Sequence, residues 1–290
     1  MIKPMLALLA LSPLALAGPP ASAQTAPPSP ADPAPEDWRD IPDGEIMVIT
    51  LKDGRQVFVR LATRFAPGHI GNIRKLIEAH WWDGTSIYRV QENWVAQWGD
   101  ATEKKELPPL IIERPAPEFE IGAFLPAQRL SKADGYSAAS GVTADGWPIA
   151  TDGKVAWLTH CYGTVGVARD ALPNTGTGAE LFTPIGQSAR RLDRNYTVVG
   201  RIVEGMQFMS ALPRSSAAMG VYATEQERTG IASVRLASQL PEDERPRFQY
   251  RATDNERYAA LIKSREVPAA PTVATGLEVC DLAPGVRRRP

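Results

Sequence analysis

The sequence predicts an all-β fold, a barrel or a sandwich, because short apolar strands recur along the chain with few helical segments between them. IMVITL (46–51) and QVFVRLA (56–62) are typical of strands, and the Asp-Gly pair between them predicts a hairpin turn. Further strands are expected in VAWLTHCYGTVGVAR (155–169), YTVVGRIV (196–203) and IASVRLA (231–237). This order differs from the regular alternation of strand and helix that builds a parallel sheet.

Two helices are expected among these strands. Pro67 opens the first, and Ile70, Ile73 and Ile77 follow at spacings of three and four residues, which places them on one buried face. GMQFMSAL (205–212) is typical of a short second helix.

The N-terminal part of the chain has the composition of an export signal followed by a linker. Lys3 precedes an apolar run, and Ala21-Ser22-Ala23 supplies the small side chains that a signal peptidase requires. Residues 1–23 are therefore expected to be a cleaved signal peptide, which predicts a periplasmic protein with no membrane attachment after cleavage. Residues 24–44 are a Pro-rich linker that is expected to stay extended without packing.

Two further segments lack strand or helix periodicity. Residues 101–153 carry several Pro and Gly residues, so long excursions with short strands are expected there. Residues 242–290 are polar and form a C-terminal extension that contains Cys280. The predicted organisation is thus a signal peptide, a linker, a domain over 45–241 and this extension, which either docks on the domain or recruits a partner.

Composition argues against nucleic acid as the partner. Of 290 residues, 43% are hydrophobic, which is enough for one sizeable core. The formal net charge is −1 and Lys and Arg form no continuous stripe, whereas a nucleic-acid surface requires concentrated positive charge. The sequence carries no indication of oligomeric state.

The two cysteines, Cys161 and Cys280, are an even pair in a chain expected to be exported. An oxidising compartment favours a disulfide between them over two buried free thiols. A hydrolase with Cys161 as nucleophile is a weaker alternative, because His160 precedes it and neighbours on a strand point to opposite faces.

Three common catalytic chemistries are not supported by the sequence. His69, His80 and His160 do not have metal-ligand spacing. NTGTGAEL (174–181) lacks the Gly-Lys-Ser/Thr of a phosphate-binding loop, and no Gly-x-Ser-x-Gly motif is present. No metal and no cofactor are therefore expected.

Two blocks of sequence resemble the cyclophilins, the family of peptidyl-prolyl cis-trans isomerases. RFAPGHIGNIRKLIEAHWWDGTSIYRVQENWVAQWGD (64–100) is similar to the family pattern AP-x-x-x-x-NF-x-x-L…YDGT-x-FHRV…F-x-x-Q-x-GD. GTVGVAR (163–169), GAELFTPIG (178–186) and LDRNYTVVGRIVEGM (192–206) then match a second block in the family's order. The resemblance covers about residues 45–241 and implies a closed antiparallel barrel of about eight strands with helices over its open ends.

The resemblance places Arg89 on the family's catalytic arginine and implies Gln97 and Phe182 as its helpers. Rotation about the peptide bond before proline breaks amide resonance, at a barrier of about 18–20 kcal/mol. As the bond twists, its nitrogen gains lone-pair character, and a guanidinium that donates mainly to this twisted state lowers the barrier. The reaction requires no nucleophile, metal or cofactor.

The same comparison implies the residues that hold the substrate. Trp94, Val95 and Leu192 fall where the family lines its proline pocket, and Ala168 and Arg169 fall on the strand edge along which the peptide lies. Tyr196 falls at the rim, and Glu180 falls where the family has glutamine. Taken singly, the apolar residues among them are equally consistent with core packing.

Several residues depart from the family pattern. Tyr88 replaces histidine, Trp98 replaces glycine, and Leu181 replaces one of the paired phenylalanines. Arg191 falls near a rim position that is often tryptophan in the family. Glu180 is the departure with the most direct chemical consequence: its carboxylate either pairs with Arg89 and cancels the charge meant for the substrate, or orients the guanidinium. A structural salt bridge of Arg89 with Asp100 or Glu92 is the further alternative.

The expected function is therefore peptidyl-prolyl cis-trans isomerisation of exported proteins, which assists their folding, with proline-containing polypeptides as substrates. The alternative is a cyclophilin-like peptide-binding module with weak or no turnover, in which replacing Glu180 by Gln restores activity.

Overall fold

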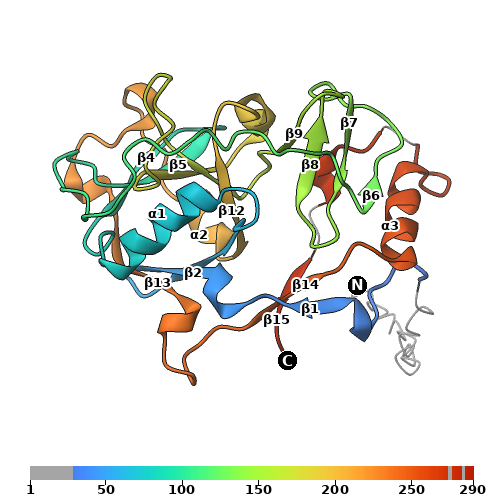
Figure 1. Cartoon of the computed structure of the whole chain (residues 1–290), viewed down its shortest axis with the longest axis horizontal. Helices are drawn as coiled ribbons and strands as arrows, with labels where there is room; N and C mark the ends of the chain where they lie inside the picture. Colours follow the sequence, from blue (N-terminus) through green and yellow to red (C-terminus); the bar gives the residue numbers. More distant parts are fainter. Residues whose placement is uncertain (1–28, 274–275, 283–284) are drawn as a thin grey trace, which may run out of the picture.

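A closed antiparallel barrel forms the larger part of the molecule (Figure 1). The structure, a computed structural model, describes residues 29–273, 276–282 and 285–290. Eight strands close the barrel in the order β10-β11-β5-β4-β13-β2-β3-β12, and β12 pairs with β10 to complete it. This confirms the predicted barrel. Its strands are β2 (Ile46–Leu51), β3 (Gln56–Leu61), β4 (Ser86–Val90), β5 (Val95–Gly99), β10 (Thr164–Val167), β11 (Leu181–Pro184), β12 (Val198–Glu204) and β13 (Thr229–Leu236).

The barrel interior and α1 share one hydrophobic core. β2 and β3 form the predicted hairpin, in which Met47 lies opposite Val59 and both are buried in this core. α1 (Pro67–Glu78) places Ile70, Ile73 and Ile77 in the same core, as the spacing predicted. The short α2 (Met206–Ser210) is also present, and its Met209 side chain is buried. Seven short 3-10 segments complete the helical structure of the described residues: η1 (Pro35–Asp37), η2 (Asp43–Glu45), η3 (Gln187–Leu192), η4 (Ala218–Gly220), η5 (Glu225–Glu227), η6 (Ala237–Gln239) and η7 (Val279–Leu282).

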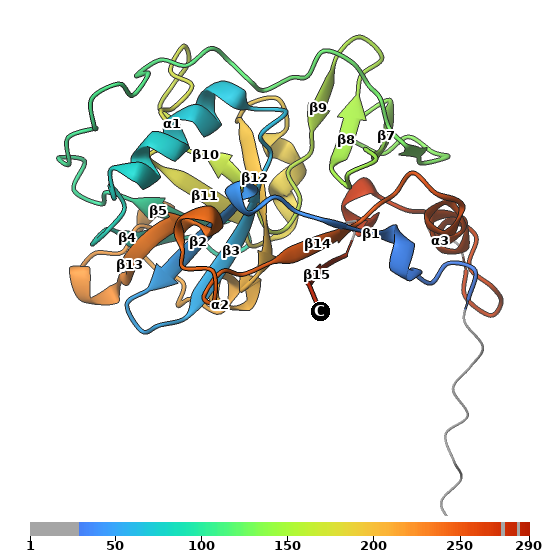
Figure 2. The same ribbon diagram turned by 60° about the horizontal axis from the view of Figure 1, so that its bottom comes forward.

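A smaller part lies beside the barrel and combines three segments that are distant in sequence (Figure 2). The N-terminal and C-terminal segments form a three-stranded sheet of β1 (Trp38–Asp40), β14 (Phe248–Arg251) and β15 (Val286–Arg288). The middle segment, residues 101–158, contains a four-stranded sheet of β6 (Gln128–Arg129), β7 (Ala139–Val142), β8 (Pro148–Thr151) and β9 (Ala156–Leu158). α3 (Glu256–Glu266) packs Tyr258 and Ile262 against Leu130 and Val142 of the middle segment in a separate core.

The expectation of an unpacked linker up to residue 44 is wrong for its last residues. β1 pairs with β14 in register, Trp38 opposite Arg251, and the side chain of Asp37 is buried against Arg257 of α3. Proline-rich composition indicates an extended backbone, but an extended backbone is also what a strand requires once a partner strand is available. The predicted signal peptide, residues 1–23, lies outside the described residues.

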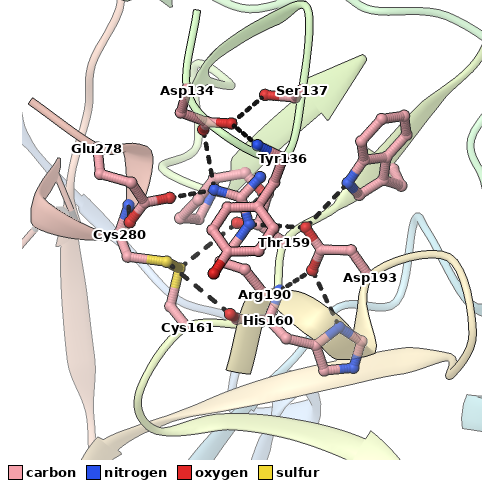
Figure 3. Close-up of polar contacts among 12 residues, drawn as sticks. Asp134, Tyr136, Ser137, Thr159, His160, Cys161, Arg190, Asp193, Glu278 and Cys280 are labelled. Carbon is pink, nitrogen blue, oxygen red and sulfur yellow. Dashed lines mark hydrogen bonds and ion pairs between the residues drawn. A yellow bond between two sulfur atoms is a disulfide. The ribbon is translucent and has the colours of Figure 1, made fainter. Parts of the chain in front are cut away.

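A disulfide and a buried charge cluster join the smaller part to the barrel (Figure 3). Cys161, between β9 and β10, is bonded to Cys280 in η7, so the predicted bridge is confirmed and the hydrolase with a Cys161 nucleophile is wrong. Arg190 of η3 contacts Asp134 of the middle segment and pairs with Glu278 of the C-terminal extension. The C-terminal extension therefore docks on the barrel.

Within the described ranges, no helix combines the length and the apolar character needed to cross a membrane.

Candidate functional site

A cavity of about 680 Å³ lies on the outside of the barrel, and its lining contains every predicted catalytic and substrate-binding residue. These are Arg89, Gln97 and Phe182, together with Trp94, Val95, Ala168, Arg169, Glu180, Leu192 and Tyr196. They lie on β4, on β5 and directly before it, on β11 and directly before it, in the residues that follow β10, and at the end of η3 and in the turn after it. Residues separated by more than a hundred positions in sequence therefore form one site.

The alternation of side chains along β5 and β11 explains why these residues face the cavity. Ala96 and Trp98 of β5 are buried in the barrel core, so Val95 and Gln97 project to the opposite face. On β11, Leu181 is in the core and Phe182 lies opposite Gln97 in the strand register. Neighbouring strands thus contribute Gln97 and Phe182 to the same face.

A β-bulge in β4 brings two successive residues to the cavity. Ile87 lies opposite Trp98, but the next paired residue, opposite Gln97, is Arg89, which leaves Tyr88 as the extra residue. In a regular strand Tyr88 and Arg89 would point to opposite faces, whereas both line the cavity here. The bulge is therefore the local feature that places the tyrosine beside the arginine.

One end of the cavity is apolar. Val95, Phe182 and Leu192 form a small buried cluster of their own, against which Trp94, Ala168 and Tyr196 pack. The Phe182 ring stacks on His160 at 6.0 Å between centroids and meets Tyr196 edge-on at 5.5 Å. This is a preformed pocket for an apolar group.

Gly166 on the neighbouring strand provides the room for the Phe182 ring. A Cβ atom at Gly166 would lie 2.4 Å from Cζ of Phe182, closer than van der Waals contact allows. Glycine at this position therefore sets the depth of the apolar pocket.

Arg89 stands beside this pocket and is held by three oxygen atoms. Its Nε donates to the Met219 carbonyl at 2.7 Å, Nη1 to Gln97 Oε1 at 3.0 Å, and Nη2 to Gln91 Oε1 at 2.8 Å. A guanidinium has more N–H groups than these contacts use. The acceptors are a carbonyl and two amides, so they orient the cation without neutralising it.

The proposed salt bridges of Arg89 are wrong. Glu92 pairs with Arg214 at 2.8 Å, and the Asp100 carboxylate accepts hydrogen bonds from the backbone of residues 102, 104 and 105. Burial acts to raise the pKa of Asp100, but these hydrogen bonds together outweigh it and lower the pKa to about 2, so the group is ionised at neutral pH. Burial lowers the pKa of Arg89 from its ordinary value.

Glu180 does not pair with Arg89 either. Its carboxylate accepts from the Tyr88 hydroxyl at 2.7 Å and from the backbone N–H of Asp100 at 2.7 Å. Burial raises the pKa of Glu180 to about 7, and the nearby negative charges of Asp100 and Glu103 act in the same direction. Burial likewise raises the pKa of Tyr88, with Glu180 adding to the shift.

The rim of the cavity contains Arg169 and Tyr196 in mutual contact. The guanidinium of Arg169 lies over the Tyr196 ring at 4.7 Å, and its Nε donates to the Asn195 carbonyl at 3.0 Å. Ala168 precedes this arginine, and its backbone N–H is already used in a bond to the Glu180 carbonyl. Of the other departures from the family pattern, Trp98 is in the core and Arg191 is an exposed residue at the rim.

Sequence reasoning did not identify two of the groups that hold Arg89. Met219 acts through its carbonyl, which any residue has, so no side-chain pattern marks it. Gln91 lies two residues after Arg89, but strand alternation alone gives it no reason to reach the guanidinium. Met219 is in η4 and has φ +60°, and a Cβ atom at Gly220 would clash with the backbone of Gln91, so the η4 segment packs closely on the end of β4.

The barrel and its site together define the class: a closed antiparallel barrel that carries a guanidinium, held by neutral acceptors, beside an apolar pocket on its outer face. The model of the family "Cyclophilin type peptidyl-prolyl cis-trans isomerase/CLD" matches residues 46–235, which is more than half of the chain. The chain therefore belongs to the cyclophilin-type peptidyl-prolyl cis-trans isomerases, enzymes that interconvert the cis and trans forms of the peptide bond before proline.

Curated relatives and a solved structure agree with this membership. A probable peptidyl-prolyl cis-trans isomerase from Brucella suis biovar 1 (strain 1330) is 27% identical over 173 residues, which are 59% of this chain and 73% of that protein. The corresponding protein of Brucella abortus (strain 2308) is 26% identical over the same length. The crystal structure of cyclophilin AquaCyp293 from Hirschia baltica covers 87% of this chain and 93% of its own, with a TM-score of 0.67 and 23% identity, which shows a shared fold.

Proposed function

We propose that this isomerase acts on X-Pro bonds of exported proteins and assists their folding, with Arg89 as the electrostatic catalyst. The observation that carries the assignment of Arg89 is its setting: a cation held by Met219, Gln97 and Gln91 through neutral oxygens, beside an apolar pocket. Its charge is available to a substrate because no carboxylate of the described residues forms an ion pair with it.

The chemistry follows from how the substrate would lie. The proline ring enters the apolar cluster of Val95, Phe182 and Leu192, and the bond before it then lies beside Arg89. When this bond twists, its nitrogen becomes a better acceptor, and the guanidinium donates to it. A charge-assisted hydrogen bond contributes about 1.5–3 kcal/mol, and the pocket supplies the remaining stabilisation by fixing the ring while the bond rotates.

The proposal of exported substrates is supported by two observations. The N-terminal residues have the composition of a cleaved export signal, and Cys161 and Cys280 form a disulfide, which persists in oxidising compartments such as the periplasm. Nascent exported chains fold in that compartment, and slow X-Pro isomerisation limits the folding of many chains.

Catalysis is tested by cis-trans exchange of a short Ala-Pro peptide measured by NMR. Wild type is expected to accelerate exchange, and Arg89→Ala to lose the acceleration while still binding the peptide. Arg39→Ala is the matched control, because Arg39 is an exposed arginine of β1 that pairs with Asp254. Peptide binding by the wild type without faster exchange would contradict this role of Arg89 and support a binding module.

Localisation is tested on the full-length chain. Expression in a Gram-negative host, cell fractionation and N-terminal sequencing are expected to give a periplasmic protein that begins at Gln24. A cytoplasmic protein that retains residues 1–23 would overturn the proposal of exported substrates and leave the assignment of Arg89 intact.

A further inference from the structure

A continuous chain of hydrogen bonds runs from the Arg89 guanidinium to a buried carboxylate. Arg89 Nη1 donates to Gln97 Oε1 at 3.0 Å, and Gln97 Nε2 donates to the Tyr88 hydroxyl oxygen at 2.5 Å. The Tyr88 hydroxyl donates to Glu180 Oε2 at 2.7 Å, and the backbone N–H of Asp100 donates to Glu180 Oε1 at 2.7 Å. We call Arg89, Gln97, Tyr88 and Glu180 the relay.

Each bond of the relay has one direction when Glu180 is ionised. A carboxylate only accepts hydrogen bonds, so the single hydroxyl proton of Tyr88 must point to it. The Tyr88 oxygen then accepts from the amide nitrogen of Gln97, which turns the amide oxygen toward Arg89. The cation thus faces an acceptor, and the charge of Glu180 determines this arrangement from the far end of the relay.

Protonation of Glu180 removes this constraint. A carboxylic acid can donate to Tyr88, and the tyrosine proton is then free to turn toward Gln97. The amide of Gln97 is stabilised in that case by the opposite orientation, in which its NH₂ group faces the guanidinium. Two donors facing each other do not form a bond, so Arg89 would lose one of its three contacts.

The backbone is shaped to hold the carboxylate at this position. A Cβ atom at Gly99 would lie 2.2 Å from the carboxylate carbon of Glu180, so glycine is required there. The bulge in β4 brings Tyr88 to the cavity face, within reach of Glu180, which directly precedes β11. The two ends of the Tyr88–Glu180 bond thus depend on two separate features of the sheet.

Tyr88 and Glu180 are also two of the positions at which this sequence departs from the family pattern, histidine and glutamine respectively. The structure shows that these two departures contact each other directly. The two departures are therefore explained together, because the hydroxyl group of one residue donates to the carboxylate of the other.

We propose that Tyr88 and Glu180 are positioning residues for the isomerase reaction: an ionised Glu180 fixes Tyr88, Tyr88 fixes Gln97, and Gln97 orients the guanidinium of Arg89. This inference rests on the assignment of Arg89 as the electrostatic catalyst. Neither residue needs to touch the substrate.

The relay makes the reaction depend on pH near neutrality. Among the described residues, the charged and titratable groups that line the same cavity as Glu180 are Tyr88 and Arg89 of β4, Asp100 after β5, Glu103 and Lys105 of the middle segment, Arg169 and Asp170 after β10, and Tyr196. Burial and the negative neighbours raise the pKa of Glu180 to about 7, so the ionised form gains population as the pH rises through this value. Activity is therefore expected to rise from about pH 6 to about pH 8.

The test measures kcat and KM for an Ala-Pro peptide from about pH 5.5 to 8.5 in wild type, Tyr88→Phe, Glu180→Gln and the double variant. Wild-type kcat is expected to rise about 3–10-fold with a midpoint near the pKa of Glu180, because one hydrogen bond contributes on this scale. Tyr88→Phe and Glu180→Gln are each expected to abolish the rise and leave KM within about twofold. The double variant is expected to match Tyr88→Phe, because both changes break one relay.

Two matched controls distinguish the relay from general effects of the substitutions. Glu242→Gln removes an exposed carboxylate whose partner is Arg247, and Tyr162→Phe removes an exposed hydroxyl that does not line the cavity. Both controls are expected to keep the wild-type pH profile. The Arg89 Nη1–H resonance, followed by ¹⁵N NMR over the same pH range, is expected to shift in wild type and to stay constant in Glu180→Gln.

The outcomes separate this inference from the assignment on which it rests. If Arg89→Ala abolishes catalysis but Tyr88→Phe and Glu180→Gln keep the wild-type rate and pH profile, the relay is overturned and Arg89 remains the catalyst. A lower melting temperature with an unchanged pH profile in both variants would also overturn the relay, since it shows a structural role alone. If Arg89→Ala keeps full activity, both the assignment and the relay fail.

Discussion

At the scale of single residues, the site depends on how one cation is held. Arg89 is partly buried, and every described group that accepts its hydrogen bonds is a neutral oxygen. A carboxylate in one of these places would bind the guanidinium more strongly but would lower its attraction for the substrate nitrogen. Neutral acceptors therefore combine a fixed orientation with a charge that remains available.

Arg89→Lys is expected to lower kcat by about 10²-fold, because an ammonium group cannot reproduce the planar arrangement of the guanidinium N–H donors. Peptide binding should change little, since the apolar pocket is intact. The measurement is the same NMR exchange experiment, with peptide titration to obtain the dissociation constant. A lysine variant with more than about half of the wild-type rate would show that charge alone, without the fork geometry, is sufficient.

Glu180 also links stability to pH. Its pKa is raised to about 7 in the folded state, above its ordinary value of 4.5, so the folded protein binds more protons between these values than the unfolded chain does. The contribution of the neutral Glu180 carboxyl group to the free energy of unfolding is therefore fully present below pH 4.5 and is lost as the pH rises through about 7. Urea unfolding at about pH 5 and about pH 8 is expected to show Glu180→Gln gaining stability relative to wild type at the higher pH. A difference between the two proteins that does not change with pH would contradict this linkage.

At the scale of elements, small backbone features decide which side chains reach the cavity. The bulge in β4 turns Tyr88 to the same face as Arg89, and Gly166 and Gly99 make room for the ring of Phe182 and the carboxylate of Glu180. Without these features the arrangement of the site on the outer face of the barrel would be lost.

Gly166→Ala is expected to displace Phe182 and raise KM for the proline peptide, because the new Cβ atom would lie 2.4 Å from the ring. Overpacking of this kind costs about 1–3 kcal/mol of stability. The matched control is Gly71→Ala in α1, where nothing lies within 4 Å of the new Cβ atom, and this change is expected to stabilise the helix by about 0.5–1 kcal/mol. An unchanged KM in Gly166→Ala would show that the pocket depth does not depend on this glycine.

At the scale of the whole molecule, a disulfide and a buried ion-pair cluster lie together at one junction between the barrel and the smaller part (Figure 3). The Cys161–Cys280 bond spans 119 residues of sequence and lies next to the buried Arg190 cluster. His160 directly precedes Cys161 and its ring stacks on Phe182, so this histidine connects the junction with the apolar pocket. The smaller part therefore contributes to the support of the site.

Replacing both Cys161 and Cys280 by Ser is expected to lower the free energy of unfolding by about 3–5 kcal/mol, because the open chain gains conformational entropy when it unfolds. Guanidinium unfolding of the double variant and of oxidised wild type, both without reductant, measures this difference. Reduced wild type should unfold like the double variant. Equal stability of the oxidised and reduced wild type would show that the bridge does not contribute to the junction.

Arg190→Met is expected to destabilise the protein by about 3–5 kcal/mol, because it leaves the Asp134 and Asp193 carboxylates buried without their cation. Arg247→Met, which breaks the exposed pair with Glu242, serves as the control and should change stability by less than about 1 kcal/mol. Similar effects of the two substitutions on the melting temperature would contradict a structural role of the Arg190 cluster.

The sequence predicted strands that coincide with β2, β3, β10, β12 and β13, the α1 helix, and ten of the residues that line the cavity. These features follow from local periodicity and from motif residues at fixed spacing: Ile70, Ile73 and Ile77 show the buried face of α1, and the YRV and GAELF segments give the positions of Arg89 and Phe182. The disulfide could also be predicted, because an oxidising compartment favours a bridge between the two cysteines of a chain expected to be exported.

The partners of each charged group and the pairing of β1 depend on tertiary contacts. Arg89, Glu92, Asp100 and Glu180 are all near one another in the sequence or the sheet, so the sequence allowed several pairings of comparable strength. The bulge at Tyr88 and the approach of η4 selected one of them, and both depend on contacts between segments that are far apart in the chain. β1 likewise is a strand because it pairs with the edge of β14, which lies near the other end of the chain. Local patterns specify which elements form, whereas long-range contacts specify which polar groups meet.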